Sequence, residues 1–108
     1  PTYVVDCAAA IWELSNLDTG IYHVAGDGNA TLYEFGMKVA EVWGLDAELL
    51  QPVSSDEFKG MAPRPKDTTY NLEKIKALGI ELSGIKEGLE KMKNQGYREL
   101  AREVVKVL

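Results

Sequence analysis

The segment Pro63–Lys66, with the sequence Pro-Arg-Pro-Lys, carries the residues of this chain best suited to bind an anion. Each proline fixes its own φ and pushes the residue before it toward extended geometry. The guanidinium of Arg64 is therefore presented from a restrained backbone, and its planar fork matches a phosphate or a carboxylate. Lys66 adds a second cation. The alternative is a solvated arginine that pairs with Asp67 or Glu73.

Met61 and Tyr70 lie on either side of these cations and are the other candidate ligand contacts. Met61, together with Phe58, could line a pocket for a sugar or a base, although apolar loop residues more often anchor a loop to the core. Tyr70 is either a packing residue or a residue at the edge of a ligand. We therefore predict a substrate-binding set of Arg64, Lys66, Met61 and Tyr70.

The other reactive side chains do not combine into a catalytic or metal site. His23 is the only histidine and has no partner for a metal site, so a hydrogen-bonded structural role is expected. Cys7 is the only cysteine, which excludes an intrachain disulfide, and without a partner base it reads as a small buried residue. Asp56 and Glu57 are adjacent, so their side chains diverge. We predict no catalytic residue and no metal site.

The composition is that of one modest domain. The chain has 108 residues, 45% of them hydrophobic, and a formal net charge of −5. Without a concentrated basic patch, nucleic acid binding is disfavoured. No apolar run is long enough to cross a membrane and no signal-peptide pattern is present, so a cytoplasmic location is the default expectation.

Hydrophobic patterning predicts alternating strands and helices. Short β-branched or apolar runs predict strands over 1–5, 21–25 and 49–53, the last at a sheet edge because of Pro52. Helical spacing and caps predict helices over 7–17, 31–43, 72–78 and 85–107, with a break near Gly96. The stretch 54–70 shows no period and is expected to be a functional loop.

This order predicts an α/β fold with a small, mainly parallel sheet and about four helices. Three strands make a thin sheet, and the strand over 21–25 has the composition of one covered on both faces. The chain also starts at Pro1, in what reads as the middle of a strand. We therefore expect 1–108 to be a single substrate-side domain or fragment of a longer protein, and we expect exposed apolar surface or oligomerisation when it is isolated.

Several short blocks, in this order, resemble the later part of the dTDP-4-dehydrorhamnose reductase family, within the extended short-chain dehydrogenase/reductase superfamily. They run from residue 1 to about 93. The blocks are Pro1-Thr2-Tyr3-Val4-Val5-Asp6-Cys7-Ala8, Gly20-Ile21-Tyr22-His23-Val24-Ala25-Gly26, Tyr33-Glu34-Phe35, and Arg64-Pro65 followed by a short helix.

The resemblance implies a parent enzyme that reduces a 4-keto nucleotide sugar with NADPH or NADH, in dTDP-rhamnose synthesis. In the wider superfamily an arginine from this region commonly contacts the diphosphate, which is the role expected for Arg64. The N-terminal dinucleotide-binding portion is absent from these residues, so this chain alone is expected to bind no cofactor and to be inactive. The expected partners are the nucleotide-sugar substrate and that N-terminal portion. Assembly into a homo-oligomer is an open alternative.

Two local matches to the family's machinery are interpreted as coincidences. Gly26-Asp27-Gly28 follows a predicted strand, but it lacks the third glycine of a dinucleotide-binding turn. Tyr70 and Lys74 have the spacing of the family's catalytic tyrosine and lysine, but the family places that pair well upstream. Two other functions stay open: a regulatory module related to the methionine adenosyltransferase β subunit, and part of a nucleotide-sugar epimerase or dehydratase.

Overall fold

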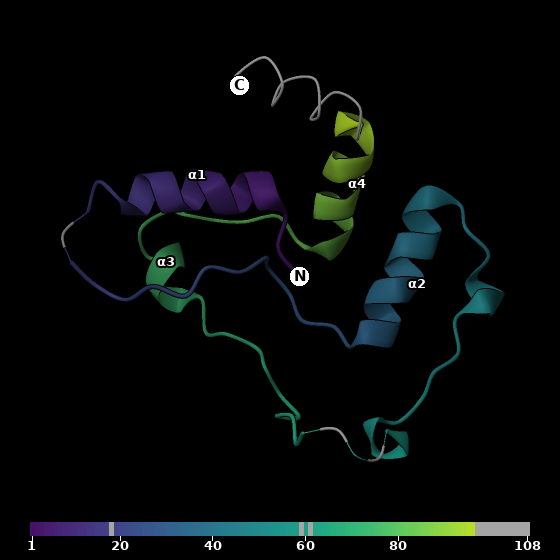
Figure 1. Ribbon diagram of the computed structural model, residues 1–108. Helices are drawn as coiled ribbons and strands as arrows, with labels where there is room; N and C mark the ends of the chain where they lie inside the picture. Colours follow the sequence, from purple (N-terminus) through teal and green to yellow (C-terminus); the bar gives the residue numbers. More distant parts are fainter. Residues whose placement is uncertain (18, 59, 61, 97–108) are drawn as a thin grey trace, which may run out of the picture.

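The computed structural model describes residues 1–17, 19–58, 60 and 62–96 of the chain. Four α-helices and two 3-10 turns follow one another along this part of the sequence (Figure 1). They are α1 (Val4–Leu14), α2 (Leu32–Trp43), η1 (Ala47–Leu49), η2 (Ser55–Glu57), α3 (Glu73–Lys76) and α4 (Ile85–Gln95).

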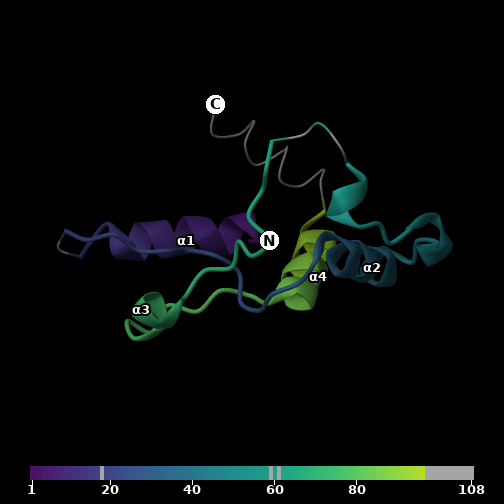
Figure 2. The same ribbon diagram turned by 90° about the horizontal axis from the view of Figure 1, so that it is seen from below.

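Helices α2 and α4 pack side by side, and α1 begins beside α4 and runs away from the pair (Figures 1 and 2). The predicted capping box of α2 is confirmed. The backbone N–H of Glu34 donates to Thr31 Oγ1 over 3.2 Å, and the Thr31 N–H donates to Glu34 Oε2 over 2.7 Å. Gly44 ends the helix with φ 65°, as expected for a left-handed stop.

Helix α1 lies earlier in the chain than the pattern predicts. It spans Val4–Leu14 instead of 7–17, so two residues of the strand predicted over 1–5 are helical. Asp6 lies inside the first turn of this helix, and its Oδ2 accepts a hydrogen bond of 2.8 Å from the backbone N–H of Ser83. Because strand preference depends on a neighbouring strand, a tertiary contact of this kind can override it.

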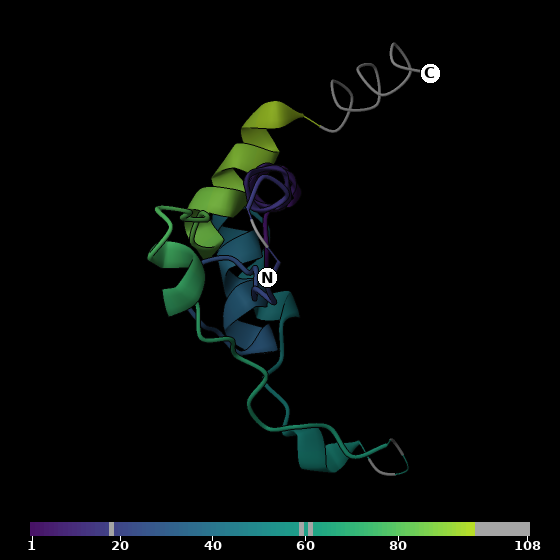
Figure 3. The same cartoon turned by 90° about the vertical axis from the view of Figure 1, so that its left-hand side faces the viewer.

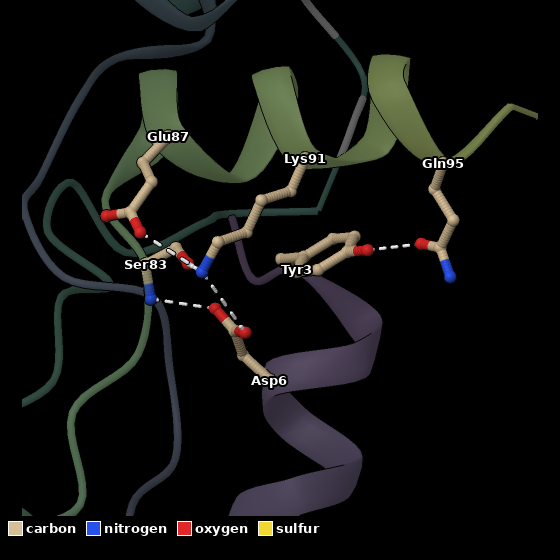
Figure 4. Close-up of polar contacts among 6 residues, drawn as sticks. All are labelled: Tyr3, Asp6, Ser83, Glu87, Lys91 and Gln95. Carbon is tan, nitrogen blue, oxygen red and sulfur yellow. Dashed lines mark hydrogen bonds and ion pairs between the residues drawn. The ribbon is translucent and has the colours of Figure 1, made fainter.

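A polar cluster fixes the start of α1 to α4 (Figure 4). Lys91 Nζ donates to Ser83 Oγ over 2.6 Å and lies 3.8 Å from Asp6 Oδ1. The Tyr3 hydroxyl donates to the side-chain carbonyl of Gln95. The hydrogen bond from Ser83 is the main cause that lowers the pKa of Asp6 below its ordinary value. These contacts join residues that lie at opposite ends of the described chain.

The hydrophobic core lies between α1, α3 and the chain segments that connect the helices. Its buried members are Ala10, Ile75, Ile80 and Leu82, and Leu14, Tyr22, Val24 and Leu72 pack against them. Helix α3 is shorter than the predicted 72–78, and it buries Ile75, which is only 1% exposed. Asn71 Oδ1 accepts a hydrogen bond of 2.9 Å from the Glu73 N–H at the start of that helix.

No strand forms among the residues that the model describes. The segments 21–25 and 50–53 have no regular secondary structure, and Leu49 belongs to η1. The single isolated bridge pairs Asp27 with Gly84 in the parallel sense, supported by the Asp27 N–H donating to the Ser83 carbonyl over 3.2 Å. The α/β class and its small parallel sheet therefore stay a prediction.

The last described helix ends where the sequence predicts a break. Helix α4 stops at Gln95, and Gly96 follows with φ 65°. The remainder of the helix predicted over 85–107 lies outside the described residues. Among those residues, no helix has the length and apolar character that a membrane crossing requires.

Candidate functional site

Three of the four predicted ligand-binding residues lie on the irregular segment between η2 and α3, which projects away from the helices (Figure 3). Arg64, Lys66 and Tyr70 are all exposed there. Met61 lies outside the described residues. Both cations therefore lie on one solvent-facing segment, and their role in binding stays a prediction.

Among the described residues, Arg64 forms no ion pair with Asp67 or Glu73, the two carboxylates with which a solvated surface arginine was expected to pair. Asp67 Oδ1 accepts a hydrogen bond of 2.9 Å from the Thr69 N–H, which lowers the pKa of that carboxyl group. Glu73 lies within 3.5 Å of the Asn71 side-chain amide. In the part of the chain that the structure describes, the Arg64 guanidinium pairs with neither carboxylate. It is presented to solvent as a donor group.

Tyr70 joins the C-terminal end of this segment to His23. Their ring centroids lie 4.9 Å apart at an interplanar angle of 63°, an edge-to-face contact. Tyr70 is still 58% exposed, so one side of its ring can face a ligand. The packing interpretation of Tyr70 is thus seen in its contact with His23, and its place at the edge of a ligand stays a prediction. His23 makes this aromatic contact, and its expected hydrogen-bonded structural role stays a prediction.

Lys74 anchors the same region from the first turn of α3. Its Nζ donates to the Ile21 carbonyl over 2.7 Å and lies 4.3 Å from the centre of the Tyr22 ring, a cation–π contact. In the described residues it makes no hydrogen bond to the Tyr70 hydroxyl. The interpretation of the tyrosine–lysine spacing as coincidence stays a prediction.

The loop Gly26-Asp27-Gly28 does not fit a dinucleotide. A Cβ at Gly26 would overlap the Pro1 carbonyl oxygen and approach the Ser83 carbonyl oxygen at 3.1 Å, so that glycine already faces protein backbone. Asp27 forms an ion pair of 2.8 Å with Lys76 and brings a negative charge where a pyrophosphate would lie.

The structure places Arg64, Lys66 and Tyr70 on an irregular loop. A shallow hollow of about 400 Å³ does lie between α2 and α4, but none of the predicted residues lines it. Its lining residues carry both signs of charge: Glu41, Val42, Lys86, Glu90, Lys93 and Asn94. In the described residues no group of three His, Cys, Asp or Glu side chains is arranged to hold a metal ion. The chemistry available on the loop is binding of an anion.

Sequence reasoning missed the contacts that hold the loop and the helices in place. The edge-to-face pair of Tyr70 with His23 and the polar cluster at Ser83 and Lys91 join residues far apart in the chain. No local pattern signals such pairs. The glycine at position 88, in the middle of a predicted helix, was the one local sign of a close contact between helices. A Cβ there would lie 3.3 Å from Tyr3 Cβ, so this glycine lets α1 approach α4 closely.

Comparison with known protein families identifies the class of this chain. The model of the RmlD substrate binding domain family matches residues 1–98, and the chain belongs to that family. The match includes the whole exposed segment that carries Arg64 and Lys66. The resemblance to reductase-type proteins is thus confirmed at the level of the family.

The similar curated proteins carry different names. The spore coat polysaccharide biosynthesis protein SpsK of Bacillus subtilis is 35% identical over 80 residues, which is 74% of this chain and 28% of that protein. The methionine adenosyltransferase 2 subunit beta of Xenopus tropicalis is 33% identical and covers 74% of this chain. The dTDP-4-dehydrorhamnose reductase of Mycolicibacterium smegmatis is 29% identical, also over 74% of this chain.

The chain spans only a quarter to about three tenths of the length of these relatives, for example 28% of the Bacillus protein and 25% of the Xenopus protein. No solved structure matches the chain. The family is therefore assigned through sequence, and the activity of the whole protein is a matter of proposal.

Proposed function

We propose that this chain is the substrate-binding region of an NAD(P)H-dependent reductase of 4-keto nucleotide sugars, of the dTDP-4-dehydrorhamnose reductase type. The observation that carries the proposal is the family match over 1–98, which names a substrate binding domain and includes the loop with Arg64 and Lys66. The cofactor and the proton donor belong to the remainder of the parent protein. These residues alone bind substrate and turn nothing over.

The loop has the charge and exposure that a nucleotide diphosphate requires. The guanidinium of Arg64 can form two parallel hydrogen bonds to a phosphate, and Lys66 supplies a point charge two residues away. Tyr70 contacts His23, and the exposed part of its ring can pack against the base or the sugar. Asp67 is already engaged by Thr69, which limits its repulsion of the ligand.

The direct test is a titration of dTDP into the isotopically labelled protein, followed by the amide signals of residues 60–72. Thymidine, which has the same base and no phosphate, is the matched control. We expect saturable shifts within 60–72 for dTDP and none for thymidine. Equal shifts with both ligands, or shifts confined to the hollow between α2 and α4, would contradict a diphosphate site on this loop.

A second test concerns the reaction. The full-length parent should oxidise NADPH in the presence of a 4-keto dTDP-sugar, and the 108-residue chain should not. Oxidation by the short chain above the buffer rate would refute the assignment of cofactor and proton donor to the remainder of the parent.

The second candidate is a non-catalytic regulatory subunit. It is favoured by the relatives from Xenopus tropicalis and Mus musculus, which are both named methionine adenosyltransferase 2 subunit beta and are 33% and 32% identical. In that case the full-length parent binds a protein partner through this region and oxidises no NADPH with any 4-keto nucleotide sugar. The same assay on the parent separates the two functions.

A further inference from the structure

His23 lies on a segment that the core and α3 hold in place. On either side of it in the chain, Tyr22 and Val24 pack against the hydrophobic core, while the His23 side chain is exposed. Lys74 of α3 fastens the same segment, because its Nζ donates to the Ile21 carbonyl over 2.7 Å and lies 4.3 Å from the centre of the Tyr22 ring. The His23 ring is therefore presented to solvent from an anchored backbone.

Tyr70 lies at the C-terminal end of the segment 62–70, all of which is exposed. Among the described residues, the hydrogen bonding within this segment is local, with the Thr69 N–H donating to Asp67 Oδ1 over 2.9 Å. The contact of Tyr70 with His23, with ring centroids 4.9 Å apart, instead joins the segment to a distant part of the chain. Because an edge-to-face pair has a preferred geometry, His23 is placed to decide which way the Tyr70 ring faces.

We propose that His23 is a positioning residue of the nucleotide site, which holds the Tyr70 ring in the orientation in which its exposed part packs against the base or the sugar. The inference rests on the proposed function, because it requires a nucleotide diphosphate to bind at this loop. Without its partner ring, the Tyr70 side chain would distribute over the staggered χ1 rotamers. The ligand would then bind more weakly, in proportion to the fraction of molecules that still present the ring correctly.

This arrangement divides the site into two parts that recognise different parts of the ligand. The cations Arg64 and Lys66 recognise the diphosphate. The Tyr70 ring contacts the base or the sugar, and His23 acts only through Tyr70. Loss of the His23 ring should therefore weaken the binding of dTDP, which has a base and a sugar, and spare the binding of inorganic pyrophosphate, which has neither.

The test is calorimetric titration of the full-length parent with dTDP and, in parallel, with inorganic pyrophosphate. We expect His23→Ala to weaken dTDP binding by roughly 2- to 10-fold, the range of an aromatic pair, and to leave pyrophosphate binding unchanged. His23→Phe keeps a ring for the edge-to-face contact and should restore most of the affinity. Ile21→Ala, which shortens an 81% exposed side chain on the same segment, is the matched control and should bind dTDP like the unmodified parent.

A double-variant cycle shows whether His23 acts through Tyr70. His23→Ala should add no further loss of dTDP affinity once Tyr70→Ala is present, because residues that act through one contact are not additive. Additive losses would overturn the inference, and so would an equal loss of pyrophosphate affinity in His23→Ala, which marks general damage to the fold. Unchanged dTDP affinity in His23→Ala would overturn the inference alone and leave the proposed function standing. An unmodified parent that binds no dTDP would overturn both.

Discussion

Lys86 of α4 and Glu41 of α2 form an ion pair across the helix interface, with 2.7 Å between Nζ and Oε1. Lys38 approaches the other carboxylate oxygen of Glu41 at 2.9 Å. The hydrogen bonds from Lys86 and then from Lys38 lower the pKa of Glu41 from 4.5 to about 2. All three side chains are about half exposed, so salt screens the attraction.

The first prediction is that Lys86→Met raises the pKa of Glu41 toward 4.5. Because the folded-state pKa is depressed, the stabilisation from Glu41 is present above pH 4.5 and is lost as the pH falls toward about 2. A carboxyl-carbon NMR titration measures the midpoint directly. Lys66→Met, on the distant loop, is the matched control and should leave it unchanged. A midpoint near 4.5 in the unmodified protein would show that the pair does not form in solution.

The second prediction is that Asp6→Ala destabilises the fold by about 1–3 kcal/mol, the cost of leaving a buried donor without a partner. The Ser83 N–H would lose its acceptor, and Ser83 is only 7% exposed. Urea unfolding measures the change. Glu13→Ala, at an exposed position of the same helix, is the control. Because the pKa of Asp6 is lowered from 3.8, the difference between the variants should shrink as the pH falls below about that value. Equal losses in both variants would contradict this account.

The third prediction concerns the close approach of three chain segments at Gly26. Gly26→Ala should destabilise the protein by about 1–3 kcal/mol or more, because the new methyl group overlaps the Pro1 carbonyl and crowds the Ser83 carbonyl. Gly84→Ala is the matched control: its Cβ would meet the Asp27 carbonyl at an ordinary 3.6 Å, and its φ of −67° suits any residue. Thermal unfolding of both variants tests this. A neutral Gly26→Ala would mean that Pro1 lies elsewhere.

The fourth prediction separates the two cations of the loop. Arg64→Ala should weaken dTDP binding by roughly 10- to 150-fold, the equivalent of about 1.5–3 kcal/mol for hydrogen bonds to a charged group. Arg64→Lys should recover only part of this, because an ammonium cannot donate the parallel pair. Lys66→Ala should have a smaller effect. Isothermal titration calorimetry provides the affinities, and wild-type affinity in Arg64→Ala would remove the residue from the site.

Local features of the fold were predictable from the sequence. The capping box of Thr31 and Glu34 and the stop at Gly44 each depend on residues within a few positions of one another. The position of α1 was not predictable, because Asp6 accepts a hydrogen bond from the distant Ser83. The exposed placement of Arg64 and Lys66 was predictable from the prolines and the lack of period. The aromatic support of Tyr70 by His23 was not, because it is a tertiary contact.

The contact between Asp6 and Ser83 spans 77 residues, and this separation has a consequence for synthesis. At a translation rate of about 5–20 residues per second, Ser83 is added roughly 4–15 s after Asp6. During that interval neither side of α1 has a docking surface made by the later chain. The nascent polypeptide therefore displays Trp12 and its neighbours to solvent, and chaperone demand should be highest before α4 emerges from the ribosome.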